Sequence, residues 1–265
     1  MPVPIALVDA FAERPFTGNP AGVVILDGPT LGDPTMQEIA LEMNQAETAF
    51  TYPQEDGTWS LRWFTPSVEV DLCGHATLAT AHRLWETDAV TEPMIAFSTR
   101  SGRLTAERIN AGIRLDFPAE PPLAADPPLN AVEILGATPL WWGRNRMDHF
   151  AVVRPEALEG DWTPRMAAIA AMGMRGLIVT AIGDHGRDFV SRCFFPQSGV
   201  PEDPVTGSAH CALAPYWGSR LGQTELIGYQ ASPRGGTVAC ALRGDRVLLT
   251  GRAITTVTGA LTTVD

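Results

Sequence analysis

The spacing of apolar residues through the first part of the chain predicts short strands and a helix. The runs 3–11 and 22–26 are typical of strands, and the segment between them contains Pro, Gly and Asn, which mark a loop. Asn19 is therefore expected on a loop between strands. Apolar residues then recur at helical spacing from Pro34 to about Asn44, and a proline is favoured in the first turn of a helix.

A strand pair and a second helix are predicted next. The runs 48–52 and 59–64 flank an Asp-Gly dipeptide, which favours a hairpin, and Glu47 lies where the first of these strands begins. Gly74 opens a helix of about twelve residues that is apolar on most sides, so this helix is expected to be buried. Further strands are predicted at 95–98, 103–107 and 112–117.

The run 118–128 holds five prolines and is interpreted as the boundary between two halves, 1–117 and 118–251. The second half is expected to repeat the order of the first: a strand near 150–154, a helix near 164–172, strands at 177–181 and 188–195, and a helix from Gly207. Pro215 should kink or break that helix. Three alternating C-terminal segments predict three more strands, and no regular strand-helix alternation supports a doubly wound sheet.

One sequence element occurs twice. The segment 73–81, CGHATLATA, returns as 206–214, TGSAHCALA, at an offset of 133 residues. Upstream, Arg62, Phe64 and Pro66 match Arg192, Phe194 and Pro196 at an offset of 130 residues. A fainter echo relates 19–24 to 148–153 at an offset of 129. We interpret the chain as two similar halves, which would normally enclose a cleft.

Charge and cysteine content narrow the possible function classes. A net charge of −11 offers no basic surface for phosphates, so nucleic acid and anionic membranes are not expected partners, although a locally electropositive pocket could still hold a small anion. Four cysteines without CxxC spacing are interpreted as reduced thiols. Neither a signal peptide nor a membrane-spanning stretch is evident, and a cytoplasmic protein is expected.

Both repeated helices begin at glycine, and helix N-termini attract anions through unpaired N–H groups. Gly74 and Gly207 could therefore hold a carboxylate or phosphate, although a glycine could also simply permit a tight entry into a buried helix. His75 is expected to be neutral because the helix N–H dipoles oppose an imidazolium, or it could serve only as a cap. Asp203 and Ser208 flank the second helix start, where Asp203, Thr206 and Ser208 could all cap the helix, and capping is the expected role of at least one of them.

Other chemistries are weakly supported. The sequence around Ser208 is not a GxSxG elbow, which disfavours a hydrolase triad. His75 and His82 lie about 10.5 Å apart along a helix, too far to share one metal ion, and no metal site is predicted. No GxGxxG or GxxxxGK[ST] motif occurs, so a mechanism without a cofactor is the simpler interpretation.

Four segments together carry a resemblance to a known family: FTGNPAGVV, ETAF, RWFTPSVEVDLCGHATLA and EDPVTGSAH. In this order they resemble the phenazine-biosynthesis PhzF-like family of the diaminopimelate epimerase superfamily, over essentially the whole chain. That resemblance implies an α+β fold with two similar lobes, each a curved, mostly antiparallel or mixed β-sheet wrapped around a central α-helix, with the active site in the interlobe cleft. It makes residues 252–265 the candidate for a return to the first lobe. It also implies a homodimer.

The resemblance assigns Glu47 as the catalytic glutamate, which takes a proton from a substrate carbon and redelivers it elsewhere. By the same argument the pocket around a small anionic metabolite is lined by Asn19, Gly74, His75, Asp203, Gly207 and Ser208. Two-base epimerases of the superfamily carry a thiol before each helix glycine, whereas here Cys73 has Thr206 as its counterpart. The sequence therefore favours an isomerase with a single glutamate acid/base. The alternatives are a catalytically silent binding protein and a thiol-assisted epimerase centred on Cys73.

Overall fold

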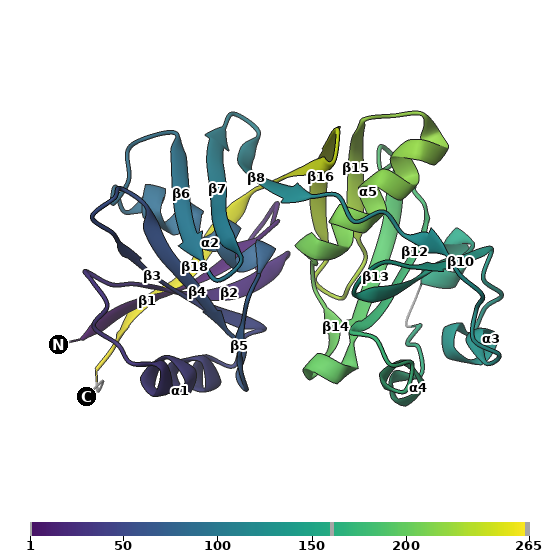
Figure 1. Cartoon of the computed structure of the whole chain (residues 1–265), viewed down its shortest axis with the longest axis horizontal. Helices are drawn as coiled ribbons and strands as arrows, with labels where there is room; N and C mark the ends of the chain where they lie inside the picture. Colours follow the sequence, from purple (N-terminus) through teal and green to yellow (C-terminus); the bar gives the residue numbers. More distant parts are fainter. Residues whose placement is uncertain (1, 160–161, 263–265) are drawn as a thin grey trace. The chain divides into compact units, whose positions relative to one another are not determined.

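The computed structural model describes residues 2–159 and 162–262. The chain divides into two compact units, Met1–Asp116 with Thr250–Asp265, and Phe117–Leu249. Both are mixed α+β structures dominated by β-sheet (Figure 1). Within residues 2–159 and 162–262, no helix combines the length and the apolar character needed to cross a bilayer.

The first unit contains a mixed sheet and two helices. Its elements are β1 (Val3–Ala10), β2 (Asn19–Ile25), α1 (Asp33–Met43), β3 (Glu47–Pro53), β4 (Trp59–Phe64), β5 (Glu69–Val70), α2 (Gly74–Glu86), β6 (Met94–Thr99), β7 (Gly102–Ile109), β8 (Gly112–Pro118) and β18 (Ala253–Leu261). Neighbouring strands pair in the order β18, β1, β2, β3, β4, β6, β7 and β8. The pairs β2/β3 and β4/β6 are parallel and the others are antiparallel.

The second unit repeats this pairing pattern. Its elements are β9 (Leu123–Ala124), α3 (Ala131–Leu135), β10 (Trp141–Arg144), β11 (Asp148–Val152), the 3-10 turn Pro155–Leu158, α4 (Met166–Ala170), β12 (Gly176–Ile182), β13 (Phe189–Phe195), the 3-10 turn Pro196–Ser198, β14 (Val200–Asp203), α5 (Gly207–Leu221), β15 (Glu225–Gln230), β16 (Gly236–Arg243) and β17 (Arg246–Gly251). In the order β10, β11, β12, β13, β15 and β16 the second and fourth pairs are parallel, as they are in the first unit when its order is counted from β1. Strand for strand it matches the order from β1 to β7.

Helix α2 is largely buried, and it contacts β1, β2, β3 and β18. Leu78, Ala79 and Leu84 are fully buried, as the apolar surface of this segment predicts. In the second unit α5 contacts β15 and β16 (Figure 1). Each helix thus begins at its glycine and packs against the sheet of its own unit.

The two ends of the described chain lie together in the first unit. Strand β18 runs antiparallel to β1, with Val3 opposite Leu261 and Ala10 opposite Ala253 (Figure 1). Residues 253–261 therefore complete the sheet that contains β1, although they follow the second unit in sequence.

Several local expectations were wrong. Asn19 is the first residue of β2, paired with Ala10 and fully buried, because the strand begins three residues before the predicted run. Helix α5 continues through Pro215, so the break is wrong, while a kink stays a prediction. The proline-rich run, interpreted as the boundary between the halves, also contains the short strand β9, which pairs with β10 and was not predicted. Strands β10, β14 and β15 and helix α3 were not predicted, and α4 is shorter than expected.

Candidate active site

A cluster of polar side chains gathers around His75 in the first unit. Strands β2 and β3 are parallel neighbours, so Asn19 and Glu47, their first residues, lie at the same edge of the sheet. Helix α2 contacts both strands and begins at that edge with Cys73 as its N-cap. The sequence-predicted residues Asn19, Glu47 and His75 are thereby brought together, with Gly74 in the backbone between Cys73 and His75.

The contacts fix the tautomer of His75. Asn19 Nδ2 lies 3.1 Å from His75 Nδ1. An amide nitrogen can only donate, so Nδ1 accepts this bond and the ring proton is on Nε2. Nε2 lies 3.3 Å from Glu47 Oε2, although the two atoms do not have the geometry of a hydrogen bond. Cys73 Sγ lies 3.5 Å from the same Nδ1.

Burial keeps this histidine uncharged. His75 is only 4% exposed, and burial lowers its pKa to about 3. The neutral ring matches the expectation from sequence, but the cause is desolvation rather than the helix N–H groups. Glu47 keeps 17% of its side chain exposed and faces a neutral donor instead of an imidazolium. A carboxylate in this setting can reach a ligand while its orientation is held.

The same cluster could hold a metal ion. Ligand atoms of Glu47, Cys73 and His75 all lie within 4.8 Å of one another, and these three residue types are ligands that Zn²⁺ accepts. The sequence argument considered only the pair of His75 and His82 and missed this set. His82 lies instead beside Glu86, with 3.7 Å between Nε2 and Oε1.

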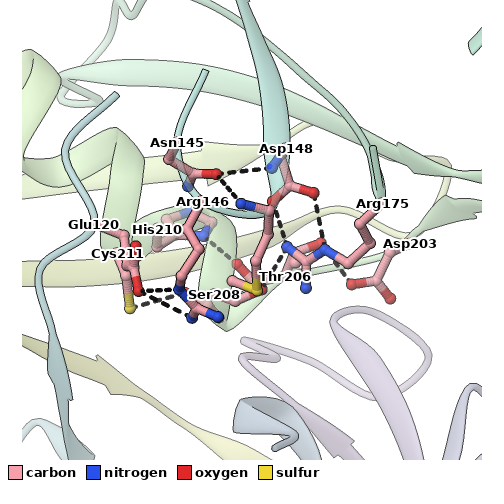
Figure 2. A network of polar contacts seen from close by, with 12 residues as sticks. Glu120, Asn145, Arg146, Asp148, Arg175, Asp203, Thr206, Ser208, His210 and Cys211 are labelled. Carbon is pink, nitrogen blue, oxygen red and sulfur yellow. Dashed lines mark hydrogen bonds and ion pairs between the residues drawn. The ribbon is translucent and has the colours of Figure 1, made fainter. Parts of the chain in front are cut away.

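The predicted residues Asp203, Gly207 and Ser208 lie in the second unit at the start of α5. Asp203 Oδ2 accepts a hydrogen bond of 2.5 Å from the hydroxyl of Thr206 (Figure 2). The side chain of Gln230 bridges the same turn, because Oε1 accepts from the Thr206 N–H and Nε2 donates to the Asp203 carbonyl. Thr206 is the N-cap, yet among the described residues its side chain makes no capping bond. Of the three residues that the sequence offered as caps, Thr206 therefore does not fill that role.

Ser208 contacts an arginine that the sequence reasoning missed. Arg175 Nη2 donates to Ser208 Oγ at 3.0 Å, and the same guanidinium is paired with Asp148 (Figure 2). Asp148 is fully buried, and its backbone N–H donates to the Asn145 side chain. The faint echo between 19–24 and 148–153 could have indicated Asp148, whereas nothing in the sequence around Arg175 signals a site.

Matched ion pairs stabilise the segments that lead to both helices. Arg62 makes two hydrogen bonds of 2.7 Å to Glu69, through Nε and Nη2. Arg192 makes the same two bonds to Glu202, also at 2.7 Å. Both arginines belong to the repeated segments, and both carboxylates follow a few residues later. Bidentate pairs fix orientation as well as distance, so each helix entrance has the same support.

Comparison with known proteins shows close relatives along the whole chain. The family model described as phenazine biosynthesis-like protein matches residues 8–259. A protein named as an uncharacterized isomerase from Halalkalibacterium halodurans is 49% identical over 259 residues, which cover 96% of this chain and 97% of that protein. A crystal structure of a PhzF-family phenazine biosynthesis protein from Enterococcus faecalis has 43% identity and a TM-score of 0.94, over 99% of this chain and 100% of that one.

A more distant structure extends the likeness in fold alone. The hydroxyproline epimerase from Agrobacterium vitis is 12% identical, with a TM-score of 0.59 over 98% of this chain and 93% of that one. Its fold resembles that of the present chain, which places the mixed sheet among epimerase-like folds.

Proposed function

The chain belongs to the phenazine biosynthesis-like (PhzC/PhzF) family, and from that membership we propose that it is a cofactor-independent isomerase in which Glu47 moves a proton within a small carboxylate-bearing metabolite. Relatives named as isomerases, 49% and 45% identical to this chain, support the reaction class. The contact between Glu47 and a neutral His75 supports the choice of the base.

The reaction needs one group that removes a proton from carbon and returns it at another position. The Glu47 carboxylate accepts the proton, and the electron pair of the broken C–H bond moves into the conjugated system of the substrate. The same carboxylic acid then gives the proton to a second carbon, so atoms and charge balance without any other reactant. One carboxylate can do this if both carbons lie on the same side of the substrate.

The neutral His75 suits this role. A protonated imidazole 3.3 Å from Glu47 would stabilise the carboxylate strongly and make it a weaker base. A neutral ring at this distance carries no full positive charge, so it lowers the basicity of the carboxylate less. Asn19 contributes indirectly, because its N–H to Nδ1 keeps the ring proton on the nitrogen that faces Glu47.

The remaining predicted residues would bind the substrate. Ser208 and the backbone N–H groups at Gly74 and Gly207 are donors suited to a carboxylate and to the negative charge that develops when the proton leaves. Asp203, held by Thr206, would accept a hydrogen bond from the substrate.

A second candidate function is a thiol-assisted epimerase, favoured by the 3.5 Å contact between Cys73 Sγ and His75. In that case the thiol would carry the proton in place of Glu47. The two candidates predict opposite effects of replacing Cys73 and Glu47.

The test is deuterium exchange from D2O into small carboxylic acids, screened by proton NMR. Once an acid that exchanges has been found, Glu47→Gln should abolish exchange, because the amide cannot accept the proton. The matched control is Glu55→Gln, an exposed position in the turn between β3 and β4. Exchange that persists in folded Glu47→Gln protein would overturn the proposal, and loss of exchange in Cys73→Ser alone would favour the thiol.

A further inference from the structure

The two units differ at the position where the first one carries Glu47. In the first unit Thr48 pairs with Phe64, so Glu47 is the residue just before that pair. In the second unit Leu177 pairs with Phe194, and Phe194 is the repeat partner of Phe64. The residue that takes the place of Glu47 is therefore Gly176, the first residue of β12.

No larger side chain fits at Gly176. A Cβ added there would overlap the carbonyl oxygen of Phe194 and the ring atom Cδ1 of Phe195. Backbone of a buried, paired strand cannot move aside easily, so the second unit cannot hold a carboxylate in the place that Glu47 occupies in the first. A second acid/base group is thus excluded at this position for a steric reason.

The residue just before Gly176 places a guanidinium at the corresponding helix start instead. In the first unit Glu47 contacts His75, which follows Gly74. In the second unit Arg175 contacts Ser208, which follows Gly207 in the repeated element. One unit therefore offers a carboxylate at its helix entrance, and the other offers an arginine.

The guanidinium of Arg175 is held by several contacts, but not all of its N–H groups take part in them. Its Nε and Nη2 donate to the carboxylate of Asp148, Nη2 also donates to Ser208, and the group lies 4.6 Å above the ring of Phe195. Burial opposes the charge, but the hydrogen bonding to Asp148 and the negative charge of Asp148 and its neighbours together outweigh it, so the pKa of Arg175 lies above its ordinary value. The side chain stays charged and is 30% exposed.

Two donors in this cluster have no acceptor within the described part of the chain. Arg175 Nη1 carries two N–H groups, and all hydrogen bonds of this side chain to described residues involve Nε or Nη2. The oxygen of Ser208 already accepts from Arg175, so its O–H must point elsewhere, and no described residue accepts it. A fixed N–H pair beside a free O–H matches the two oxygens of a carboxylate.

We propose that Arg175 and Ser208 bind a carboxylate group of the substrate, with Asp148 and Phe195 holding the guanidinium in place. This rests on the proposed function in one respect, namely that the ligand is the substrate; the anion site itself does not depend on Glu47. Asp148 makes the pair neutral overall, so the site selects by paired hydrogen bonds rather than by bare charge. It discriminates carboxylates from the corresponding amides, which bring donors to a place that already has donors.

The test uses malonate as the probe and malonamide as its neutral counterpart, with binding followed by NMR of protein carrying ¹⁵N-labelled arginine. Malonate should shift the Arg175 side-chain signals, and malonamide should not. Arg175→Gln should weaken malonate binding by roughly 10-fold to 100-fold, the range expected when a charge-assisted pair is lost. Arg165→Gln is the matched control, since Arg165 is an exposed arginine of the same unit paired with Glu133. It should leave the affinity unchanged.

Two further variants guard against a purely structural effect. Arg175→Gln leaves Asp148 buried without its partner, so Asp148→Asn combined with Arg175→Gln restores a neutral, foldable interior that should still bind malonate weakly. Ser208→Ala keeps the ion pair and should weaken binding about three-fold to ten-fold, the loss of one hydrogen bond. Malonate affinity within two-fold of wild type in the double variant, or unshifted Arg175 signals, would overturn the inference.

The outcome is independent of the test of Glu47. In Glu47→Gln protein malonate should still bind at Arg175. If Glu47→Gln protein binds malonate normally and still exchanges deuterium at the wild-type rate, Glu47 is not the base, but the anion site at Arg175 stands. If Glu47→Gln protein loses deuterium exchange but the Arg175 and Ser208 variants bind malonate normally, the base is supported and the anion site is refuted.

Discussion

Acidification from pH 7.5 to 5.0 should destabilise this protein strongly through its buried histidines. Burial lowers the pKa of His75 to about 3 and that of His210 to about 4, whereas a histidine in an unfolded chain titrates near ~6.5. Between these values the unfolded chain binds protons that the folded chain does not. Stability is therefore full above about pH 6.5 and falls as the pH drops toward the folded values.

The size of this loss of stability at pH 5.0 depends only on the pKa of histidine in the unfolded chain, because both buried histidines are still neutral in the folded protein at that pH. At pH 5.0 the pH lies about 1.5 units below the pKa of a histidine in the unfolded chain. Each unit changes the free energy of unfolding by about 1.4 kcal/mol, so each buried histidine lowers the stability by about 2 kcal/mol. His75 and His210 together remove about 4 kcal/mol, a large share of a typical stability of about 5–15 kcal/mol. Burial also lowers the pKa values of His82 and His149, which act in the same direction.

Urea denaturation at both pH values, followed by tryptophan fluorescence and by circular dichroism, measures the loss. The informative variant is His210→Asn, because an asparagine nitrogen can replace Nδ1 as the donor to the Thr206 carbonyl, 2.8 Å away, but cannot be protonated. Its stability should change with pH by about 2 kcal/mol less than that of wild type. The control His185→Asn, at a side chain that is 91% exposed, should behave like wild type. Equal pH dependence in His210→Asn and wild type would refute the reasoning.

Three further predictions concern the second unit and the thiol. Gly176→Ala should lower the free energy of unfolding by roughly 1–3 kcal/mol or more, since its Cβ overlaps Phe194, whereas Gly28→Ala, with open space around its Cβ, should stay within about 0.5 kcal/mol. Urea denaturation that finds the two alike would contradict the steric argument. Glu202→Gln should cost about 3–5 kcal/mol in the same assay, because it leaves the buried Arg192 guanidinium without its carboxylate; a loss below about 1 kcal/mol would show that the pair is dispensable. Cys73→Ser should retain deuterium exchange within about 10-fold of wild type, and a loss as large as that of a missing general base, about 100-fold or more, would assign the proton to the thiol.

Local patterns predicted the elements whose signals are periodic or carry turn chemistry. The strand 59–64 and the helix from Gly74 have the expected bounds or nearly so, because an Asp-Gly turn and a nearly continuous apolar surface are encoded within a few residues. Strand β14 was missed because Val200–Asp203 contains a proline and only four residues. Asn19 was misplaced because polar residues in a strand look like a loop until the burial that the neighbouring strands impose is known.

Some residues of the candidate site could be named from the sequence, but the contacts between them could not. Glu47, His75, Asp203 and Ser208 could be named because a family resemblance marks them in the sequence. The contacts that give them chemical meaning could not, since Glu47 meets His75 only when β3 and α2 are packed. Arg175 lies in a short polar segment without any periodic signal, and its importance depends on Asp148, which is 27 residues away. Chemistry assembled across elements is visible only in three dimensions.

The central claim is that Glu47 alone carries the proton. Deuterium incorporation from D2O into an acid that the wild-type protein exchanges, measured by proton NMR for wild type, Glu47→Gln and Glu55→Gln at equal concentration, tests it most directly. The account predicts exchange by wild type and Glu55→Gln and none by Glu47→Gln. Exchange by folded Glu47→Gln protein at the wild-type rate would contradict it.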